Sequence, residues 1–281
     1  MDRFHRSFEL GKASWRVLRA NQALAAVALL SLVGSVAVGA FFALLAWAAG
    51  GGNSTGFHSG PAFWLVVVLG YVASAMVSTY CTAALVVGAD VALSGGEATV
   101  ALSLAGANRK LHRILPWAIV VATVSIVLRA LERNGLVGQV IAGLLGFAWA
   151  VLTFLALPVI VLEDVGVGQT LTRSRELLRQ TWGENLFGQL GLGLFSVALM
   201  LPAVVIFGVA VVTGVGAVVV VGIVLALAWA LAVSVIVSAL SGIYRTALYR
   251  YAVEGFIPEA FEGVGIESAF EPRKGRKRFG F

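Results

Sequence analysis

Residues 217–240 read AVVVVGIVLALAWALAVSVIVSAL, a run of 24 residues that contains no charged side chain. A helix of about 20 such residues crosses the roughly 30 Å hydrocarbon layer of a bilayer. Because hydrocarbon offers the backbone no hydrogen-bonding partner, an apolar run too long for a barrel strand must bond its own backbone as an α-helix. This stretch therefore predicts a transmembrane helix.

The same criterion predicts six transmembrane helices in the whole chain. Besides 217–240, the apolar runs cover residues 23–49, 61–89, 114–131, 136–162 and 190–212. The run 114–131 is the weakest, since Arg129 lies near its end, where its side chain can reach the headgroups. Thr213–Gly216 separates the last two runs and supplies the residues of a tight turn. We expect an all-α membrane protein.

The overall composition agrees with this class. Hydrophobic residues make up 59% of the 281 residues and charged residues 12%, which is about half the charged fraction of soluble domains. We interpret residues 1–245 as one six-span domain and residues 246–281 as a cytoplasmic tail with a basic end. The first apolar run exceeds the roughly 7–15 residues of a signal peptide. We expect it to remain as an uncleaved first span.

The distribution of basic residues predicts the orientation. Alternation of six spans places eighteen of the twenty Lys and Arg residues on one side and leaves Arg129 and Arg133 on the other. Cytoplasmic loops carry the excess of basic residues in membrane proteins. The sequence therefore predicts a multi-pass protein of the cell membrane with both termini in the cytoplasm.

Three short amphipathic segments precede the odd-numbered spans. Their predicted apolar stripes are Phe4, Phe8, Gly11, Trp15 and Leu18; then Val100, Leu104, Ala107, Leu111 and Leu115; then Val167, Leu171, Ser174, Leu178 and Trp182. Basic residues lie opposite each stripe, as in helices that rest in the membrane interface. We expect three interfacial helices, with Phe4, Phe8, Trp15, Arg16, Arg19 and Trp182 as the candidate contacts to the membrane.

The recurrence of a short helix before a hairpin of two spans suggests three repeats, at 1–89, 90–162 and 163–240. Thr99 and Ser103 have the same spacing as Thr170 and Ser174. The alternative is that cytoplasmic connections of many membrane proteins are basic and amphipathic. The sequence leaves both interpretations open.

We expect no catalytic, cofactor-binding or metal site. The three histidines are distributed over both sides of the predicted membrane, and the single cysteine, Cys81, lies in an apolar run. Charged residues are absent from the middle of the predicted spans, where ion-coupled transporters usually have one. Small and hydroxyl residues recur at four-residue spacing, which favours close helix packing over a polar path. Examples are Ser31-Ser35-Gly39, Ser74-Ser78-Thr82, Ala142-Gly146-Ala150 and Ser234-Ser238-Gly242.

One acidic pair, Glu163 and Asp164, lies where the fourth predicted span meets the third amphipathic segment. Carboxylates are favoured near a helix N-terminus, so we expect a structural role and keep a cation or substrate site as the weaker alternative. The net charge of +6 suggests anionic lipid headgroups as partners. The chain has no nucleic-acid-binding motif, so nucleic acid is not expected.

Several motifs resemble a known family. The tail carries Ala247-Leu248-Tyr249-Arg250-Tyr251-Ala252, then Gly255, Pro258, Phe261 and Ala269-Phe270-x-Pro272, with Ser14-Trp15, Pro158, Glu163, Ser174 and Trp182-Gly183 upstream. This pattern resembles a family of uncharacterised six-span prokaryotic membrane proteins. It is also similar to the membrane domain of some glycerophosphodiester phosphodiesterases. The resemblance implies the six-helix architecture and no activity, because the catalytic domain of those enzymes does not occur in these residues.

The function expected from the sequence is non-enzymatic. The chain would organise lipids or protein partners, including a second copy of itself, through its interfacial helices and basic tail. The alternative is a transporter or channel for a small or amphiphilic solute.

Overall fold

The structure is a computed structural model that describes residues 2–50, 60–180, 182–255 and 258–261. Within these ranges, the side chains of residues 2–10, 180, 182–192, 194 and 195 are not described. The described residues form helices and no strand. The helices are α1 Asp2–Ala20, α2 Gln22–Ala49, α3 Pro61–Leu93, α4 Val100–Arg109, α5 Leu111–Glu132, α6 Gly135–Leu152, α7 Ala156–Glu163, α8 Val167–Gln180, α9 Trp182–Val212, α10 Gly216–Glu254 and the 3₁₀ turn η1 Glu259–Phe261.

Five helical segments among the described residues are long and apolar enough to cross a membrane: α2, α3, α5, α6 together with α7, and α10. The weakest predicted span, 114–131, lies within one of them, α5. The predicted span 190–212 lies in α9, whose apolar part with described side chains, Ser196–Val212, is shorter than the other five. Five of the predicted spans are thus confirmed as apolar helices of spanning length.

The predicted fourth span is not one continuous helix. α6 ends at Leu152 and α7 begins at Ala156. The residues between them, 153–155, form turns with hydrogen bonds between residues three apart. Pro158 explains the break, because its ring cannot donate a backbone hydrogen bond and clashes with the carbonyl four residues earlier in a helix. The hydroxyl of Ser174 on α8 donates to the carbonyl of Leu152 at 2.6 Å. A side chain from the next helix thereby bonds a carbonyl at the end of α6.

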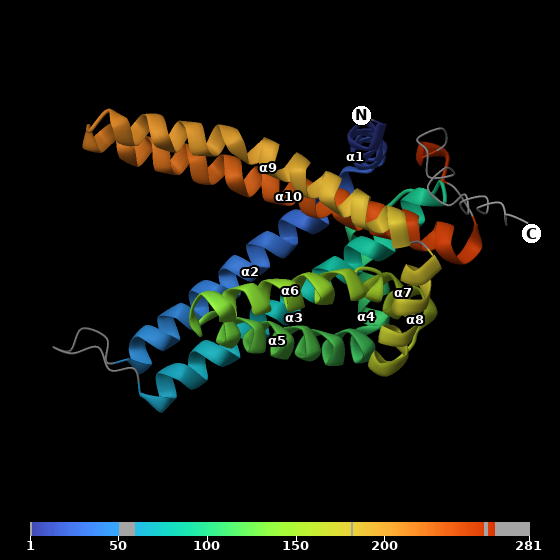
Figure 1. The fold of residues 1–281 in the computed structure, drawn as a ribbon, viewed down its shortest axis with the longest axis horizontal. Coiled ribbons are helices and arrows are strands. Elements are labelled where there is room, and N and C mark those ends of the chain that lie inside the picture. Colours follow the sequence, from blue (N-terminus) through green and yellow to red (C-terminus); the bar gives the residue numbers. More distant parts are fainter. Residues whose placement is uncertain (1, 51–59, 181, 256–257, 262–281) are drawn as a thin grey trace, which may run out of the picture.

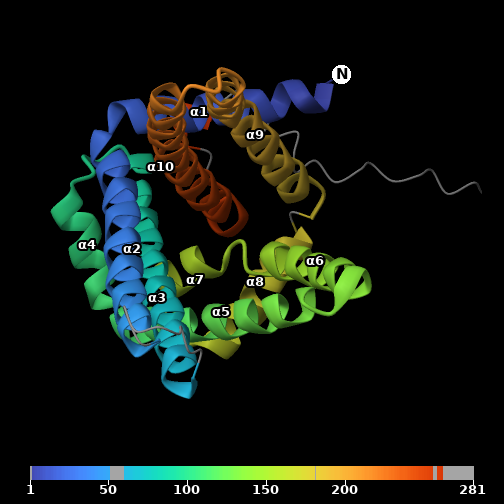
Figure 2. The same ribbon diagram turned by 90° about the vertical axis from the view of Figure 1, so that its left-hand side faces the viewer.

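The long helices form three hairpins, α2 with α3, α5 with α6, and α9 with α10 (Figure 1). The turn predicted at Thr213–Gly216 joins α9 to α10, and Gly214 has a φ of +65°, which favours glycine. The hairpins diverge from the end of the molecule where α1, α4, α7 and α8 lie (Figures 1 and 2). Their far ends carry exposed apolar side chains, such as Leu136 at 81% and Val212 at 87% exposure. Such surfaces suit contact with lipid rather than water.

Each short helix lies against one end of a hairpin. α4 packs on α3, α8 packs on α7, and α1 packs on α9 and α10. The first helix of the chain therefore covers the last hairpin, which closes the arrangement into a ring (Figure 2). Each short helix has a fully buried serine, Ser14, Ser103 or Ser174, beside a second fully buried residue, Ala13, Ala107 or Thr170.

The buried core lies at this same end of the molecule, where α3, α7 and α10 meet. Leu85, Ile160 and Ile243 are buried there. Gly242 of α10 lies so close to Leu85 that an added Cβ would collide with that side chain. α10 continues as a helix to Glu254, beyond the boundary at residue 245 drawn from the sequence, and Phe261 of η1 is buried in the same core.

Candidate functional site

The ends of the hairpins are joined by a group of charged and hydroxyl side chains that we call the polar junction. Its members come from the ends of α3, α7 and α10, from α8, and from the boundary between α4 and α5. They are Asp90, Lys110, Arg113, Glu163, Asp164, Arg173, Tyr249 and Arg250.

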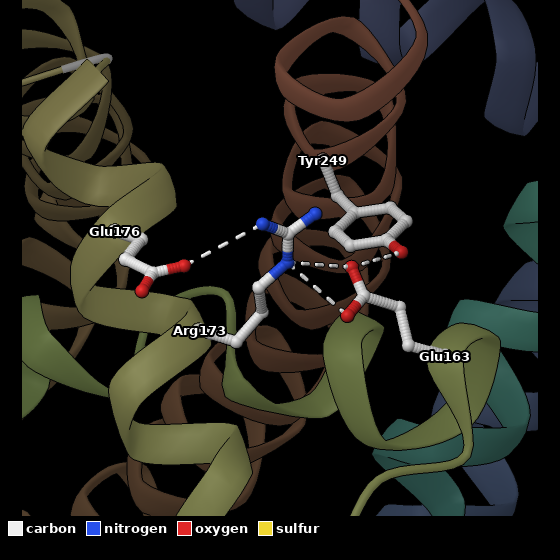
Figure 3. Close-up of polar contacts among 4 residues, drawn as sticks. All are labelled: Glu163, Arg173, Glu176 and Tyr249. Carbon is white, nitrogen blue, oxygen red and sulfur yellow. Dashed lines mark hydrogen bonds and ion pairs between the residues drawn. The ribbon is translucent and has the colours of Figure 1, made fainter.

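Glu163, the last residue of α7, joins three helices (Figure 3). Nε of Arg173, on α8, lies 3.2 Å from both carboxylate oxygens of Glu163. The hydroxyl of Tyr249, on α10, donates to Oε1 of Glu163 at 3.0 Å. Arg173 also pairs with Glu176 at 3.6 Å, and the two carboxylates raise the pKa of Arg173 above its ordinary value. Glu163 is thus compensated by one cation and one hydroxyl donor.

Asp164 joins α7 to the start of α5. Its backbone is left-handed, with a φ of +56°, a conformation that Asp and Asn adopt more readily than most residues. Its carboxylate lies 3.2 Å from Nζ of Lys110 and 3.8 Å from Nε of Arg113. The hydrogen bond from Lys110 and the nearby positive charges hold the pKa of Asp164 below its usual value. The side chain remains 47% exposed, so solvent screens these interactions.

The interaction that stabilises the carboxylates of Glu163 and Asp164 in the structure differs from the one expected from the sequence. The sequence suggested stabilisation by the N-terminus of the next helix, but α8 begins at Val167, and Glu163 and Asp164 lie at the C-terminal end of α7. A carboxylate is disfavoured by the helix dipole at that end. The compensation comes from the cations of Lys110, Arg113 and Arg173.

A second set of contacts joins α3 to α10. Nε of Arg250 lies 3.1 Å from Asp90, and a terminal nitrogen of Arg250 donates to Ser94 at 2.7 Å. Glu254 lies 3.6 Å from the same arginine, one helical turn away. These contacts, like those of Glu163, hold the end of α10 against the end of another helix.

A shallow hollow of about 350 Å³ lies beside Arg173 on the surface of α7 and α8. Its lining consists of Glu163, Val165, Gly168, Gln169, Thr172, Arg173 and Glu176. The charged groups in the lining pair with one another. The ion pairs of Arg173 with Glu163 and Glu176 therefore form part of the wall of this hollow.

Of the six residues predicted to contact the membrane, three have described side chains, and all three are exposed. Trp15 is 43% exposed, and Arg16 and Arg19 are exposed, whereas Leu18 of the same predicted stripe is buried against protein. The side chains of Phe4, Phe8 and Trp182 lie outside the described residues.

The predicted apolar stripes of the other short helices face the protein. Ala107 of α4 is buried, and Val100 and Leu104 pack against the core. On α8, Ser174 and Leu178 are buried and Leu171 packs against the core. The outward face of α8 is basic and carries Arg175 and Arg179, whereas the outward face of α4 carries Arg109 together with the exposed Leu102.

The hydroxyl residues of the long helices, which a polar path would need, bond mostly within their own helices. Thr82, Thr123, Ser125 and Ser234 each donate to the carbonyl four residues earlier. Tyr80 differs, since its hydroxyl bonds the Asn108 side chain of α4 at 2.8 Å. Among the described residues, no cluster of His, Cys, Asp and Glu has the arrangement of a metal site.

Sequence reasoning identified Glu163 and Asp164 but missed their partners. Arg173 is ten residues away along the chain and Tyr249 is 86 residues away. The signal available was the Tyr249-Arg250 pair in the tail, since polar residues that interrupt the buried face of an apolar helix need a partner.

A comparison with protein-family models finds a match over residues 61–258 to DUF6159, a family of unknown function. The chain belongs to this family. The match to DUF6159 includes all residues of the polar junction and begins at the first residue of α3. No curated protein and no solved structure matches the chain. Membership of DUF6159 therefore brings no assigned activity, and no link to glycerophosphodiester phosphodiesterases is shown.

Proposed function

We propose that this DUF6159 protein is a non-enzymatic organiser of the cell membrane, which gathers anionic lipids or partner proteins at the cytoplasmic face. In this proposal α9 is the sixth span, and both termini lie in the cytoplasm. The short helices α1, α4 and α8 then lie at the level of the cytoplasmic headgroups.

The observation that carries the proposal is the set of outward basic residues on the three short helices. The described exposed ones are Lys12, Arg16, Arg19, Arg109, Arg175 and Arg179. The helices lie around one end of the molecule (Figure 2). A basic residue near an anionic membrane surface contributes about 1 kcal/mol of attraction. Several such residues in a ring would enrich anionic lipids beside the protein.

The three-repeat interpretation supports this arrangement. In each proposed repeat a short helix with a fully buried serine precedes a hairpin. α4 and α8 pack on the hairpin of the preceding repeat, and α1 packs on that of the last repeat. Three equivalent units around one axis would repeat the same basic face three times. An isolated basic loop would supply only one.

The test compares lipid selectivity in reconstituted protein. We expect the wild-type chain to bind spin-labelled phosphatidylglycerol in preference to phosphatidylcholine, and to lose much of this preference at high salt. Replacing Arg16, Arg19, Arg175 and Arg179 by Gln should reduce the preference at least tenfold. The matched control replaces Arg129 and Arg133, on the predicted opposite side, and should leave it unchanged. Equal preference in both variants would refute the proposal.

A transporter or channel is the second candidate. It is favoured by the apolar faces of α4 and α8, which pack across the ends of the hairpins rather than facing outward. If the polar junction closed a path, Glu163→Gln with Asp164→Asn would raise solute leakage from vesicles that contain the protein. Leakage equal to that of the wild type would exclude this role for the junction.

A further inference from the structure

Arg245 of α10 is a cation without a charged partner among the described residues. It lies five residues beyond the predicted end of the last span, at Leu240, and one helical turn before Tyr249. Its guanidinium carbon lies 4.9 Å from the centre of the Phe154 ring. Phe154 belongs to the break between α6 and α7.

The Nε atom of Arg245 is shielded from solvent and has no hydrogen-bond partner. Nε of Arg113 and of Arg250 also lacks a hydrogen-bond partner, but both lie near a carboxylate, Arg113 near Asp164 and Arg250 near Asp90. Arg173 pairs with Glu163. Arg245 as a whole is only partly exposed, and shielding part of a guanidinium from water is unfavourable unless an anion or hydrogen-bond acceptors compensate it. A ring face gives some cation–π attraction but neutralises no charge.

The neighbouring groups that the structure describes do not supply a negative charge to Arg245. The Phe154 ring beside the guanidinium packs in turn on the Tyr244 ring, with 6.1 Å between the ring centres, and neither ring carries a charge. The carboxylate held by the next turn of α10, Glu163, is already occupied by Arg173 and Tyr249. α7 begins two residues after Phe154, and the start of a helix carries positive partial charge. The local field therefore favours an anion from outside the chain.

We propose that Arg245 binds a phosphate group, either the phosphodiester of a membrane lipid or a free phosphate. A planar guanidinium binds two phosphate oxygens at once, which is the pairing that arginine makes best. The aromatic rings beside it would contact the carbon atoms of the same ligand. This site lies on α10 and the α6–α7 break, so it does not depend on the basic faces of the short helices.

The experiment uses the full chain, freed of bound lipid in an uncharged detergent. One arm titrates inorganic phosphate and measures the thermal unfolding midpoint. The other arm adds short-chain phosphatidylglycerol or phosphatidylcholine to the protein in the same phosphate-free detergent, measures the same midpoint, and counts retained lipids by native mass spectrometry. Stabilisation in the lipid arm alone identifies a lipid phosphate, and stabilisation by inorganic phosphate identifies a soluble ligand.

The matched variants are Arg245→Gln and Arg133→Gln, which each remove one charge. We expect Arg245→Gln to bind the stabilising anion at least fivefold more weakly and Arg133→Gln, at the far end of α5, to respond like the wild type. If Arg245→Gln does not fold, Arg245→Lys keeps the charge without the planar fork and should show the weakened response. The proposal is overturned if neither anion stabilises the wild type, or if the Arg245 variants respond as the wild type does.

Discussion

Glu163 shows how one side chain can fix the relative positions of three helices. Its carboxylate meets Arg173 from α8 and Tyr249 from α10 at the end of α7 (Figure 3). Removing the negative charge leaves Arg173 with the more distant Glu176 alone. The consequences of substitution therefore depend on the arginine as much as on the glutamate.

We expect Glu163→Gln to lower the free energy of unfolding by about 1–2 kcal/mol. The loss is smaller than for a fully buried pair, because Arg173 is 38% exposed and solvent takes part of the charge. Thermal unfolding in detergent, followed by tryptophan fluorescence, measures the change. Glu176→Gln, whose carboxylate is more exposed, is the control and should change stability by less than about 0.5 kcal/mol.

The paired variant Glu163→Gln with Asp164→Asn should lower stability and leave lipid selectivity intact. Loss of selectivity in a folded double variant would show that the acidic pair binds a ligand.

Asp164 predicts a dependence of stability on pH. Its pKa is lowered in the folded chain, so its ion pairs stabilise the protein above the ordinary carboxyl pKa of about 4. This stability is lost as the pH falls through the lowered value. Asp164→Asn keeps a residue that tolerates the left-handed backbone. The difference in unfolding midpoint between wild type and variant should be constant above about pH 5 and shrink below about pH 4. A difference that persisted unchanged at lower pH would assign the effect to hydrogen bonding rather than charge.

At this scale the sequence identified an acidic pair and could not identify its partners. Glu163 and Asp164 stand out because charged residues are rare in the chain. Which cation reaches them depends on how α5, α8 and α10 rotate about their axes. That rotation is set by packing between segments distant in sequence, and a single sequence does not contain it.

At the scale of elements, the α9–α10 hairpin depends on close approach at Gly222. A Cβ placed there would collide with Cβ of Ala210, which cannot move without its backbone. We expect Gly222→Ala to destabilise the protein by about 1–3 kcal/mol. Gly208→Ala, on the same hairpin but with no atom within 4 Å of the new methyl group, should be neutral or stabilise by up to about 1 kcal/mol. Equal effects in unfolding experiments would show that the hairpin is loosely packed.

The outward face of α1 predicts membrane binding by the isolated segment. A peptide of residues 1–21 should become helical on anionic vesicles, and salt should weaken its binding. Phe8→Ser with Trp15→Ser should weaken it by about 2–4 kcal/mol, from the apolar area lost. Val17→Ser changes the protein-facing side and should have a smaller effect. A peptide that ignored vesicles would place these aromatic side chains against protein and favour the transporter hypothesis.

The positions of the long apolar helices were predictable because a span needs about 20 apolar residues, and the turn at Thr213–Gly216 followed from its glycines. Their full lengths were not, since α10 continues past the predicted end at Leu240 to Glu254. The break before Pro158 was missed, although the proline was visible, because the surrounding run is long enough for one span. The faces of α4 and α8 were also misjudged. Their apolar stripes suit a membrane as well as they suit the end of a hairpin, and periodicity alone does not distinguish these two surroundings.

At the scale of the whole molecule, orientation is the property that can be tested most directly. Reporter fusions after Leu18, Arg109, Arg175 and Arg278 should report cytoplasm, and fusions near Asn53 and Asn134 should report the exterior, because basic loops are retained inside. A cytoplasmic signal near Asn53 would overturn the orientation. A cytoplasmic signal near Asn134 would mean that α5 does not cross the membrane.

The contact between α1 and the last hairpin has a consequence for biosynthesis. α1 leaves the ribosome before α9 and α10, yet its buried face, with Ala13, Val17 and Leu18, packs among helices that include both of them. Contacts between distant segments form slowly, since a long loop must close before they are made. Until α9 and α10 are inserted, the growing chain therefore carries the amphipathic α1 with its apolar face not yet covered by them. A truncated product would keep that helix exposed, which gives cellular proteases and chaperones a means of recognising incomplete copies.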